Sequence, residues 1–254
     1  MSDSQYEFVS YRVEDGVATL RLERPEKKNA INEPMRREIE DAIDAFEASD
    51  ATVLVLAGTE DAFSAGTDIG ELEERLPEDA GEALEIEPYD LPERVAAVDR
   101  PTIAMVNGVA AGGGCELALG CDVRIASTDA RLGFPEITLG GFPAEGGTQR
   151  LPRETNTGTA LFYLLTGELV PAERAREDGL VQEVHPPDAL EERTREIAAT
   201  IAEKDRAALV LAKKVATLSG RVDFERGLEL EGLLANVLEL TPERRARLDE
   251  FLEE

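Results

Sequence analysis

The fold of this 254-residue chain is decided by the stretch NGVAAGGGCELALGCD, which runs from Asn107 to Asp122. It follows the apolar run TIAMV at Thr102–Val106, which predicts a buried strand. Its three consecutive glycines, Gly112–Gly114, precede an apolar helical pattern, so free N–H donors are expected at the positive end of a helix. A phosphate-binding loop does not fit, because no Lys-Ser or Lys-Thr pair follows and the GxGxxG spacing is absent. We therefore expect this turn to hold developing negative charge.

A second small-residue turn lies upstream and also follows a strand. The run TVLVL at Thr52–Leu56 predicts another buried strand, and the segment DAFSAGTDI at Asp61–Ile69 comes directly after it. Small side chains let the backbone approach a ligand and leave its N–H groups free to donate. Taken alone this segment is weak evidence for a site, since a small-residue turn after a strand is more often just a turn.

Strand and helix patterns alternate through the first part of the chain. Val17–Leu22 alternates like a strand, and the helix after it is capped by Asn32 and has Pro34 in its first turn. The expected buried face of this helix consists of Met35, Ile39, Ala42, Ile43 and Phe46. The order strand, helix, strand indicates an α/β architecture of layered sheets.

The chain from about Pro171 onward has mostly helical patterns. The expected helices are Ala172–Glu177, Asp188–Glu203, Ala207–Leu218, Phe224–Leu240 and Pro242–Leu252. We divide the chain into a core at residues 1–190 and a C-terminal helical region at residues 191–254. The acidic segment Glu71–Arg94 contains three prolines and no clean period, which predicts a loop.

Two glutamates accompany the two turns. Glu116 lies just inside the helix that the glycines open, and Glu136 lies between a proline and a β-branched residue in LGFPEI. Each has an ordinary explanation, since Glu116 can complement the helix dipole and Glu136 can be a solvated loop carboxylate. Together with two donor turns, the pair suits proton transfer next to a carbonyl.

The charge balance excludes several classes of partner. Lys and Arg total 27 against 54 for Asp and Glu, which gives a formal net charge of −27. This charge repels nucleic-acid phosphates and anionic membrane surfaces, so we expect neither as a partner. The acid excess resembles that of proteins from organisms with molar cytoplasmic salt, which screens charge to within about 3 Å at 1 M. We therefore hypothesise a halophilic, cytoplasmic protein, since the start MSDSQYEFVS has no signal pattern.

The cysteines and the single histidine suggest no further chemistry. Cys115 and Cys121 cannot form a disulfide framework, and without a cluster of further ligands they predict no metal site. We expect them to pack as small apolar residues. His185 has no GxSxG segment to accompany it, so a Ser-His-Asp triad is not expected.

With these residues in place, the chain resembles the enoyl-CoA hydratase/isomerase, or crotonase, superfamily. The matching pieces occur in the order of the family and cover nearly the whole chain. They are RPEKKNAIN (24–32), FSAGTDI (63–69), NGVAAGGGCELALGCD (107–122), FPEITLG with GGTQRL (134–151), LTGELVPAERAREDGLV (165–181) and the segment near 207–213.

The resemblance implies a fold, an assembly and a set of site residues. The fold is a superhelix of ββα turns followed by a helical trimerisation region, assembled as a homotrimer or a dimer of trimers. The backbone N–H groups of Thr67 and Gly113 form the oxyanion hole for the thioester oxygen, and Glu116 and Glu136 match the two catalytic carboxylates. The residues implied in coenzyme A binding are Arg24, Lys27, Lys28, Ala65, Gly66, Asp68 and Ile69. For Lys27 and Lys28, a solvated positive patch is the competing explanation.

The implied activity is hydration of an enoyl-CoA thioester. Glu116 mainly activates the water and Glu136 delivers the α-carbon proton, with no cofactor, since the coenzyme A thioester is itself the substrate. Isomerases and other branches often lack one carboxylate, so the presence of both favours a hydratase. The pathway we expect for such a hydratase is fatty-acid β-oxidation. The alternatives are an enoyl-CoA isomerase, another crotonase-type lyase or hydrolase, and a non-catalytic binding subunit.

The chain departs from the family pattern in three places. Hydratases commonly read Pro-Gly-Ala-Gly-Gly where this chain has PAEGG at Pro143–Gly147. The N–H expected to touch the catalytic water therefore belongs to Ala144, and Glu145 brings a third carboxylate within reach of the site. Thr67 replaces the usual Ala of the oxyanion turn, where the backbone alone is needed. The sequence also stops short of the basic, aromatic tail that often reaches coenzyme A in relatives.

Overall fold

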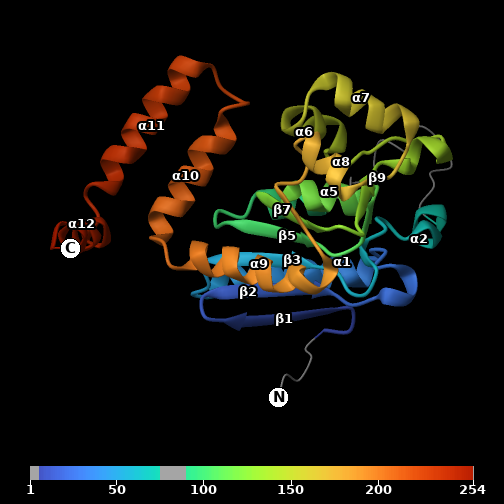
Figure 1. Cartoon of the computed structure of the whole chain (residues 1–254), viewed down its shortest axis with the longest axis horizontal. Helices are drawn as coiled ribbons and strands as arrows, with labels where there is room; N and C mark the ends of the chain where they lie inside the picture. Colours follow the sequence, from blue (N-terminus) through green and yellow to red (C-terminus); the bar gives the residue numbers. More distant parts are fainter. Residues whose placement is uncertain (1–5, 75–89, 254) are drawn as a thin grey trace.

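The computed structural model describes residues 6–74 and 90–253. Within this part of the chain two sheets form the centre of the molecule (Figure 1). The larger sheet has the order β1 (Val9–Glu14), β2 (Val17–Leu22), β3 (Val53–Ala57), β5 (Thr102–Val106), β7 (Val123–Ser127) and β10 (Glu183–His185). The smaller sheet has the order β4 (Ala62–Ser64), β6 (Val109–Ala111), β8 (Arg131–Gly133) and β9 (Val170–Pro171).

The strands repeat one ββα motif. Each of β3, β5 and β7 leads into a short strand of the smaller sheet, β4, β6 or β8. A helical segment follows each time, namely α2 (Ile69–Glu74), α5 (Gly113–Gly120) or the 3-10 helix η2 (Pro135–Leu139). The predicted strands β2 and β5 match residue for residue, and β3 is shifted by one residue. The ββα architecture expected from the sequence is therefore present.

Helix α1 (Glu33–Ala48) has the cap and the buried face that the sequence predicts. The Asn32 side chain accepts a hydrogen bond from the Met35 N–H at 3.0 Å, which satisfies a free donor of the first turn. The apolar residues expected to face inward are all buried: Met35, Ile39, Ala42, Ile43 and Phe46.

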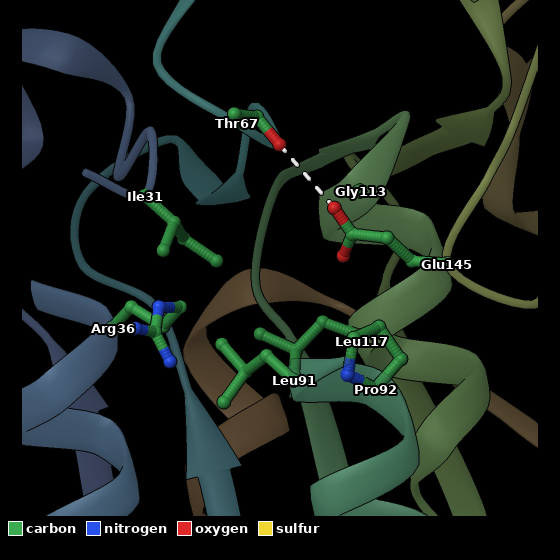
Figure 2. Close-up of a pocket in the computed structure, with 8 residues that line it drawn as sticks. All are labelled: Ile31, Arg36, Thr67, Leu91, Pro92, Gly113, Leu117 and Glu145. Atoms are coloured by element: carbon green, nitrogen blue, oxygen red, sulfur yellow. Dashed lines mark hydrogen bonds between the residues drawn. The ribbon is translucent and has the colours of Figure 1, made fainter. Parts of the chain in front are cut away.

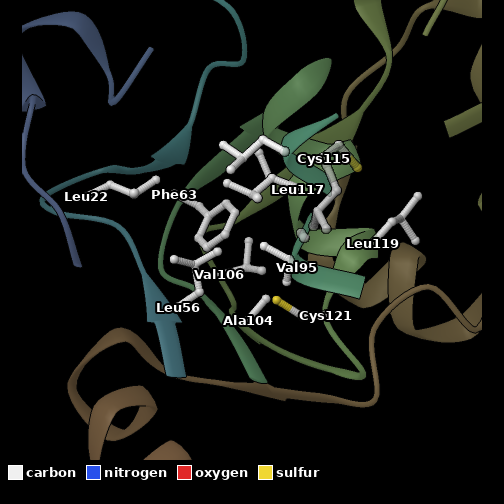
Figure 3. Close-up of a cluster of buried hydrophobic side chains, with 14 of the residues drawn as sticks. Leu22, Leu56, Phe63, Val95, Ala104, Val106, Cys115, Leu117, Leu119 and Cys121 are labelled. Atoms are coloured by element: carbon white, nitrogen blue, oxygen red, sulfur yellow. The ribbon is translucent and has the colours of Figure 1, made fainter. Parts of the chain in front are cut away.

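The larger sheet is covered on both faces, as its continuous apolar strands require. On one face Figure 3 shows Phe63 and Val106 packed in a cluster with Cys115 and Cys121. Both cysteines are buried, which confirms that they pack as apolar residues. Helix α9 (Pro187–Ala202) covers the other face and contacts several of its strands.

The ends of the predicted loop Glu71–Arg94 are helical, so that prediction is wrong there. Its first residues belong to α2, and its last belong to α4 (Leu91–Ala96). Pro92 lies in the first turn of α4, where the backbone N–H of any residue would have no acceptor within the helix. The proline that was expected to interrupt regular structure therefore begins a helix. The rest of the predicted loop, residues 75–89, lies outside the described residues.

The helices predicted for the C-terminal part are present, with ends shifted by at most two residues. Besides α9 they are α8 (Ala172–Glu177), α10 (Arg206–Leu218), α11 (Phe224–Leu238) and α12 (Pro242–Glu253). Three further helical segments were not predicted: η1 (Pro25–Lys27), α6 (Gly147–Glu154) and α7 (Thr157–Thr166). In Figure 1, α10, α11 and α12 extend away from the sheets. The predicted boundary after residue 190 falls inside α9. None of the helices described in residues 6–74 and 90–253 has the length and apolar character needed to cross a bilayer.

Candidate active site

The two small-residue turns meet at the N-terminus of α5. A Cβ atom on Gly66, whose φ is +91°, would lie 2.8 Å from the Ala111 carbonyl oxygen and 2.9 Å from the Gly113 nitrogen. Glycine is therefore required for this close approach. A Cβ atom on Gly113 would in turn lie 3.5 Å from the Thr67 nitrogen. The fold thus brings the amides of Thr67 and Gly113 to one place.

Both amides are free to bind a ligand. Within the described part of the chain, neither the Thr67 N–H nor the Gly113 N–H donates to a protein acceptor. Gly113 is the first residue of α5, so its N–H belongs to the positive end of the helix. Two converging donors of this kind can stabilise an oxygen that gains negative charge.

A buried asparagine, Asn29, supports the Thr67 turn through hydrogen bonds to the strand before it. The Asn29 side chain is fully buried and its Nδ2 donates to the Ala62 carbonyl at 2.9 Å. Its backbone carbonyl accepts from the Ser64 hydroxyl at 2.8 Å, and the neighbouring Lys28 carbonyl accepts from the Ala65 N–H at 2.9 Å. The loop before α1 and the turn after β4 therefore form one unit.

Two residues implied in coenzyme A binding contact each other. Arg24 Nη1 donates to Asp68 Oδ2 at 2.6 Å and to the Ala30 carbonyl at 2.9 Å. The Arg24 guanidinium holds the pKa of Asp68 below its usual range. This ion pair ties the loop to the turn, whereas the side chains of Lys27 and Lys28 are exposed.

Glu116 projects from α5 and is only 2% exposed. Its Oε1 accepts hydrogen bonds from the Glu145 N–H at 2.8 Å and the Gly147 N–H at 2.7 Å. Burial raises the pKa of Glu116, and these N–H groups oppose the rise because they favour the ionised form. One oxygen of the carboxylate is thus fixed in place by the backbone.

Glu136 lies in η2 and faces the start of α5. A Cβ atom on Gly112 would lie 3.1 Å from Glu136 Oε1, so glycine at that position leaves room for the carboxyl group. Glu136 Oε2 is buried and has no hydrogen-bond partner among the described residues. Burial first, and also the negative charge of Glu116, raise the pKa of Glu136 to about 7. Glu136 is therefore not a solvated loop carboxylate, and its unpartnered oxygen is available to a ligand.

Glu145 places a third carboxyl group beside the oxyanion turn. Its Oε1 accepts a hydrogen bond from the Thr67 hydroxyl at 3.5 Å (Figure 2). Burial first, and then the charge of Glu116, raise the pKa of Glu145 to about 7. Ala144, expected to position water, is exposed, and its N–H is not one of those that Glu116 accepts.

Thr67, Gly113 and Glu145 border one small cavity of about 10 Å³. Figure 2 shows that Thr67, Gly113 and Glu145 line one side of it. The other lining residues are Ile31, Arg36, Leu91, Pro92 and Leu117. Two N–H donors beside carboxyl groups in different environments suit a reaction that forms an enolate and moves protons next to it. Among the described residues no cluster of His, Cys, Asp or Glu side chains could hold a metal ion.

Comparison with known proteins identifies the family. The sequence model of the enoyl-CoA hydratase/isomerase family matches residues 12–254. The chain belongs to this family. It is 36% identical to a crotonyl-CoA hydratase of Syntrophomonas wolfei, a match that covers 98% of this chain and 96% of the relative. It is 38% identical to the 2,3-dehydroadipyl-CoA hydratase of Escherichia coli, covering 93% and 92% of the two chains.

Solved structures of the enoyl-CoA hydratase/isomerase family share the fold. The crystal structure of enoyl-CoA hydratase from Bacillus anthracis superposes with a TM-score of 0.90 at 34% identity. The match covers 97% of this chain and 96% of that one. The crotonase-like fold class that the sequence predicted is therefore confirmed.

Two residues that hold the site together were not predicted from the sequence. Asn29 supports the Thr67 turn, and Arg150 Nη1 donates to the Glu145 carbonyl at 3.0 Å. Both lie inside motifs matched to the family, RPEKKNAIN and GGTQRL. Their position in those motifs was the only indication of a supporting role that the sequence offered. Neither side chain is a nucleophile or a general acid or base, so a search for catalytic residues does not select them.

Proposed function

We propose that this protein is an enoyl-CoA hydratase, a hydro-lyase that adds water across the 2,3-double bond of an enoyl-CoA thioester. One observation carries the proposal: the free amides of Thr67 and Gly113 meet at the helix start that Glu136 faces and from which Glu116 projects. The names of the two relatives above, both hydratases, support the same reaction.

In the proposed mechanism the thioester oxygen lies between the amides of Thr67 and Gly113. Charge moves onto this oxygen when the enolate forms, and the N–H donors at the start of α5 stabilise it. Losing one such donor costs about 10²- to 10³-fold in rate in other enzymes. The donors are backbone groups, so a threonine at position 67 supplies the same contact as alanine.

The two glutamates divide the proton transfers. Glu116, oriented by two N–H groups, takes a proton from water while the hydroxide adds to C3. Glu136, whose pKa lies at about 7, delivers a proton to C2. Water thus supplies the OH group that adds to C3, and its remaining proton goes to Glu116. Glu116 then releases this proton to solvent and Glu136 takes one up, so each carboxyl group returns to its starting state. We assign the Ala144 N–H to the positioning of this water.

We place coenzyme A along the loop before α1 and the turn after β4. Backbone groups of Ala65 and Gly66 would meet the adenine, and the exposed lysines Lys27 and Lys28 would meet the phosphates. Arg24 and Asp68 would shape this surface through their ion pair. Ile69 is 66% exposed at the start of α2 and would add apolar contact. The coenzyme A thioester is the substrate, so the reaction needs no separate cofactor.

We propose a homotrimer or a dimer of trimers. Helices α10 and α11 contain no buried residues, and their exposed side chains include Phe224 at 80% and Leu233 at 60%. Phe251 of α12 is 75% exposed. Contacts between subunits would remove this apolar surface from water.

We further propose a cytoplasmic enzyme of fatty-acid β-oxidation that works in concentrated salt. The net charge of −27 supports the salt requirement, because dissolved ions screen the repulsion among the acidic groups. The enoyl-CoA substrate class supports the place in β-oxidation.

The reaction is tested with crotonyl-CoA and a 3-enoyl-CoA, assayed side by side in high salt. The wild-type protein, Glu116→Gln and Glu136→Gln are compared. Hydration of crotonyl-CoA that is lost in both variants supports the proposal. Isomerisation that survives Glu116→Gln would instead identify an isomerase, and no turnover of a panel of coenzyme A esters would favour a binding subunit.

A further inference from the structure

Glu145 borders the same small cavity as the two amides of the oxyanion turns. Thr67, Gly113 and Glu145 all line this cavity, and its volume of about 10 Å³ admits about one water-sized group. A thioester oxygen is a group of that size. An oxygen that enters the cavity between the two amides therefore lies beside the carboxyl group of Glu145.

The Glu145 carboxyl group is directed into this cavity. Figure 2 shows the end of its side chain pointing towards Thr67, whose hydroxyl lies 3.5 Å from Glu145 Oε1. The Thr67 hydroxyl oxygen also lies 3.5 Å from the place that a Cβ atom on Gly113 would take. The contact with Oε1 leaves the second oxygen, Oε2, without a hydrogen bond to any of the described residues. Oε2 is therefore available to a ligand at the start of α5.

The backbone of Glu145 is fixed by hydrogen bonds to two side chains. Its N–H donates to Glu116 Oε1 at 2.8 Å, and its carbonyl accepts from Arg150 Nη1 at 3.0 Å. The Gly147 N–H donates to the same Glu116 oxygen at 2.7 Å. A carboxyl group on a segment held in this way is preorganised, which is what a donor to a developing charge requires.

The surroundings of Glu145 favour its protonated form. Burial first, and then the negative charge of Glu116, raise the pKa of Glu145 to about 7. The Thr67 hydroxyl opposes this rise, and the charges of Glu136 and Asp90 add to it. Below neutral pH the Glu145 carboxyl group is therefore mostly an acid that has a proton to donate.

The cation that borders the cavity does not neutralise an ionised Glu145. Among the described residues that line the cavity this cation is Arg36, which lies across from Glu145 in Figure 2. Its guanidinium donates to Glu33 at 2.7 Å and also to Glu40, and none of its ion pairs with described residues involves Glu145. An ionised Glu145 would thus oppose the enolate charge, whereas the neutral acid can stabilise it.

We propose that Glu145, as a neutral carboxylic acid, donates a third hydrogen bond to the thioester oxygen beside those of the Thr67 and Gly113 amides. The proton stays on Glu145, so this donor takes no part in the transfers assigned to Glu116 and Glu136. Neutral carboxylic acids serve as oxyanion donors in other enzymes. This inference rests on the proposed function, since it concerns the same thioester oxygen.

The donor also gives one role to two departures from the family pattern. Thr67 and Glu145 both differ from the residues that commonly stand at their positions, and their side chains contact each other. The Thr67 hydroxyl holds Oε1, so the acidic proton on Oε2 can point at the thioester oxygen.

The kinetics of crotonyl-CoA hydration in high salt at about pH 6 test the third donor. Glu145→Met and Glu145→Ala remove it and keep the backbone N–H that Glu116 accepts. Glu145→Gln keeps the volume of the side chain and offers a neutral N–H donor in place of the acid. Asp90→Asn is the matched control, because it removes a nearby negative charge and Asp90 does not line the cavity.

Glu145→Met and Glu145→Ala should lower kcat about 10²-fold, the cost of one oxyanion donor, and should change KM less than about threefold. Glu145→Gln should keep kcat within about tenfold of the wild type, and Asp90→Asn within about threefold. Wild-type kcat in Glu145→Met and Glu145→Ala would overturn the proposal. An equal loss in Glu145→Gln would also overturn it, because a donor would then not be what the site had lost.

The pH dependence separates the donor from a merely structural role. Wild-type hydration requires a proton on both Glu136 and Glu145, so log kcat/KM should fall above about pH 7 with a limiting slope of about −2. In Glu145→Gln only Glu136 titrates there, and the limiting slope should be about −1. The same slope in both proteins would overturn the proposal.

The third donor and the proposed function fail in different ways. A wild-type protein that hydrates no enoyl-CoA contradicts the proposed function. The donor is then tested by the infrared C=O stretch of bound butyryl-CoA that carries ¹³C at the thioester carbonyl, because a hydrogen bond to the oxygen lowers this frequency.

At about pH 6 the C=O frequency should be higher in Glu145→Met than in the wild type, with Glu145→Gln between them. Raising the pH to about 8 should raise the frequency in the wild type and leave it unchanged in Glu145→Gln. Equal frequencies in the three proteins at about pH 6 would overturn the third donor, even if kcat differs among them. A pH-dependent shift that persists in Glu145→Gln would overturn it as well.

Discussion

Replacing Gly66 with alanine should open the oxyanion hole without removing any catalytic group. The new Cβ would lie 2.9 Å from the Gly113 nitrogen, whereas ordinary contact begins at 3.4 Å, so the two turns must separate by about 0.5 Å. Oxyanion donors work at about 2.7–3.1 Å from the charged oxygen, and this separation is enough to lose the contribution of one donor. We therefore expect kcat for crotonyl-CoA hydration to fall about 10²-fold, measured from the loss of the enoyl thioester absorbance.

Gly16→Ala is the control for backbone strain. Gly16 also has a positive φ, +78°, but its Cβ would meet Ala202 at an ordinary 3.6 Å, far from the site. Each substitution should cost about 1–3 kcal/mol in free energy of unfolding because alanine tolerates positive φ poorly. Urea unfolding measures this cost, and kcat of Gly16→Ala should stay within about threefold of wild type. A folded Gly66→Ala enzyme with wild-type kcat would refute the oxyanion geometry.

Four further results are expected. Glu116→Gln and Glu136→Gln should each lower kcat by about 10²- to 10⁴-fold. Circular dichroism should show that both variants remain folded. Wild-type turnover in either variant would remove that residue from the mechanism. Burial raises the pKa of Glu136 to about 7, above the ordinary 4.5. We therefore expect kcat/KM to decline as pH rises through about 7 and Glu136 loses its proton, and a flat profile there would contradict the assignment. For the same reason, the stability that protonated Glu136 contributes is fully present below about pH 4.5 and is lost as pH rises through about 7. The free energy of unfolding of Glu136→Gln, measured by urea titration, should therefore fall less over this pH range than that of the wild type. Dialysis from molar salt to low salt should lower Tm because 27 net negative charges lose their screening, and an unchanged Tm would remove the halophilic hypothesis.

Local patterns were sufficient for the long elements of the fold. The alternating pattern of β2, the apolar run of β5 and the capped, one-sided helix α1 each lie within one segment, so their positions were predictable. The three-residue strands β4, β6 and β8 are too short for a periodic pattern. Proline was misread near α4 because Pro92 starts a helix as readily as it ends one.

The site depends on contacts between distant positions, which a single sequence does not reveal. The Thr67–Glu145 contact joins residues 78 positions apart, and the Arg24–Asp68 pair joins residues 44 positions apart. The pKa of Glu136 is also raised mainly by burial, which could not be predicted from the local sequence around this residue. The sequence could therefore predict the reactive groups, but the contact between Glu145 and the oxyanion turn required the fold.

The most direct test of the oxyanion hole is a crystal structure with butyryl-CoA, a saturated thioester that cannot be hydrated. The account predicts the thioester oxygen about 2.7–3.1 Å from the backbone nitrogens of both Thr67 and Gly113, with the carboxyl groups of Glu116 and Glu136 facing C3 and C2. A thioester oxygen beyond hydrogen-bond distance of either nitrogen, or an acyl group turned away from the two glutamates, would contradict it.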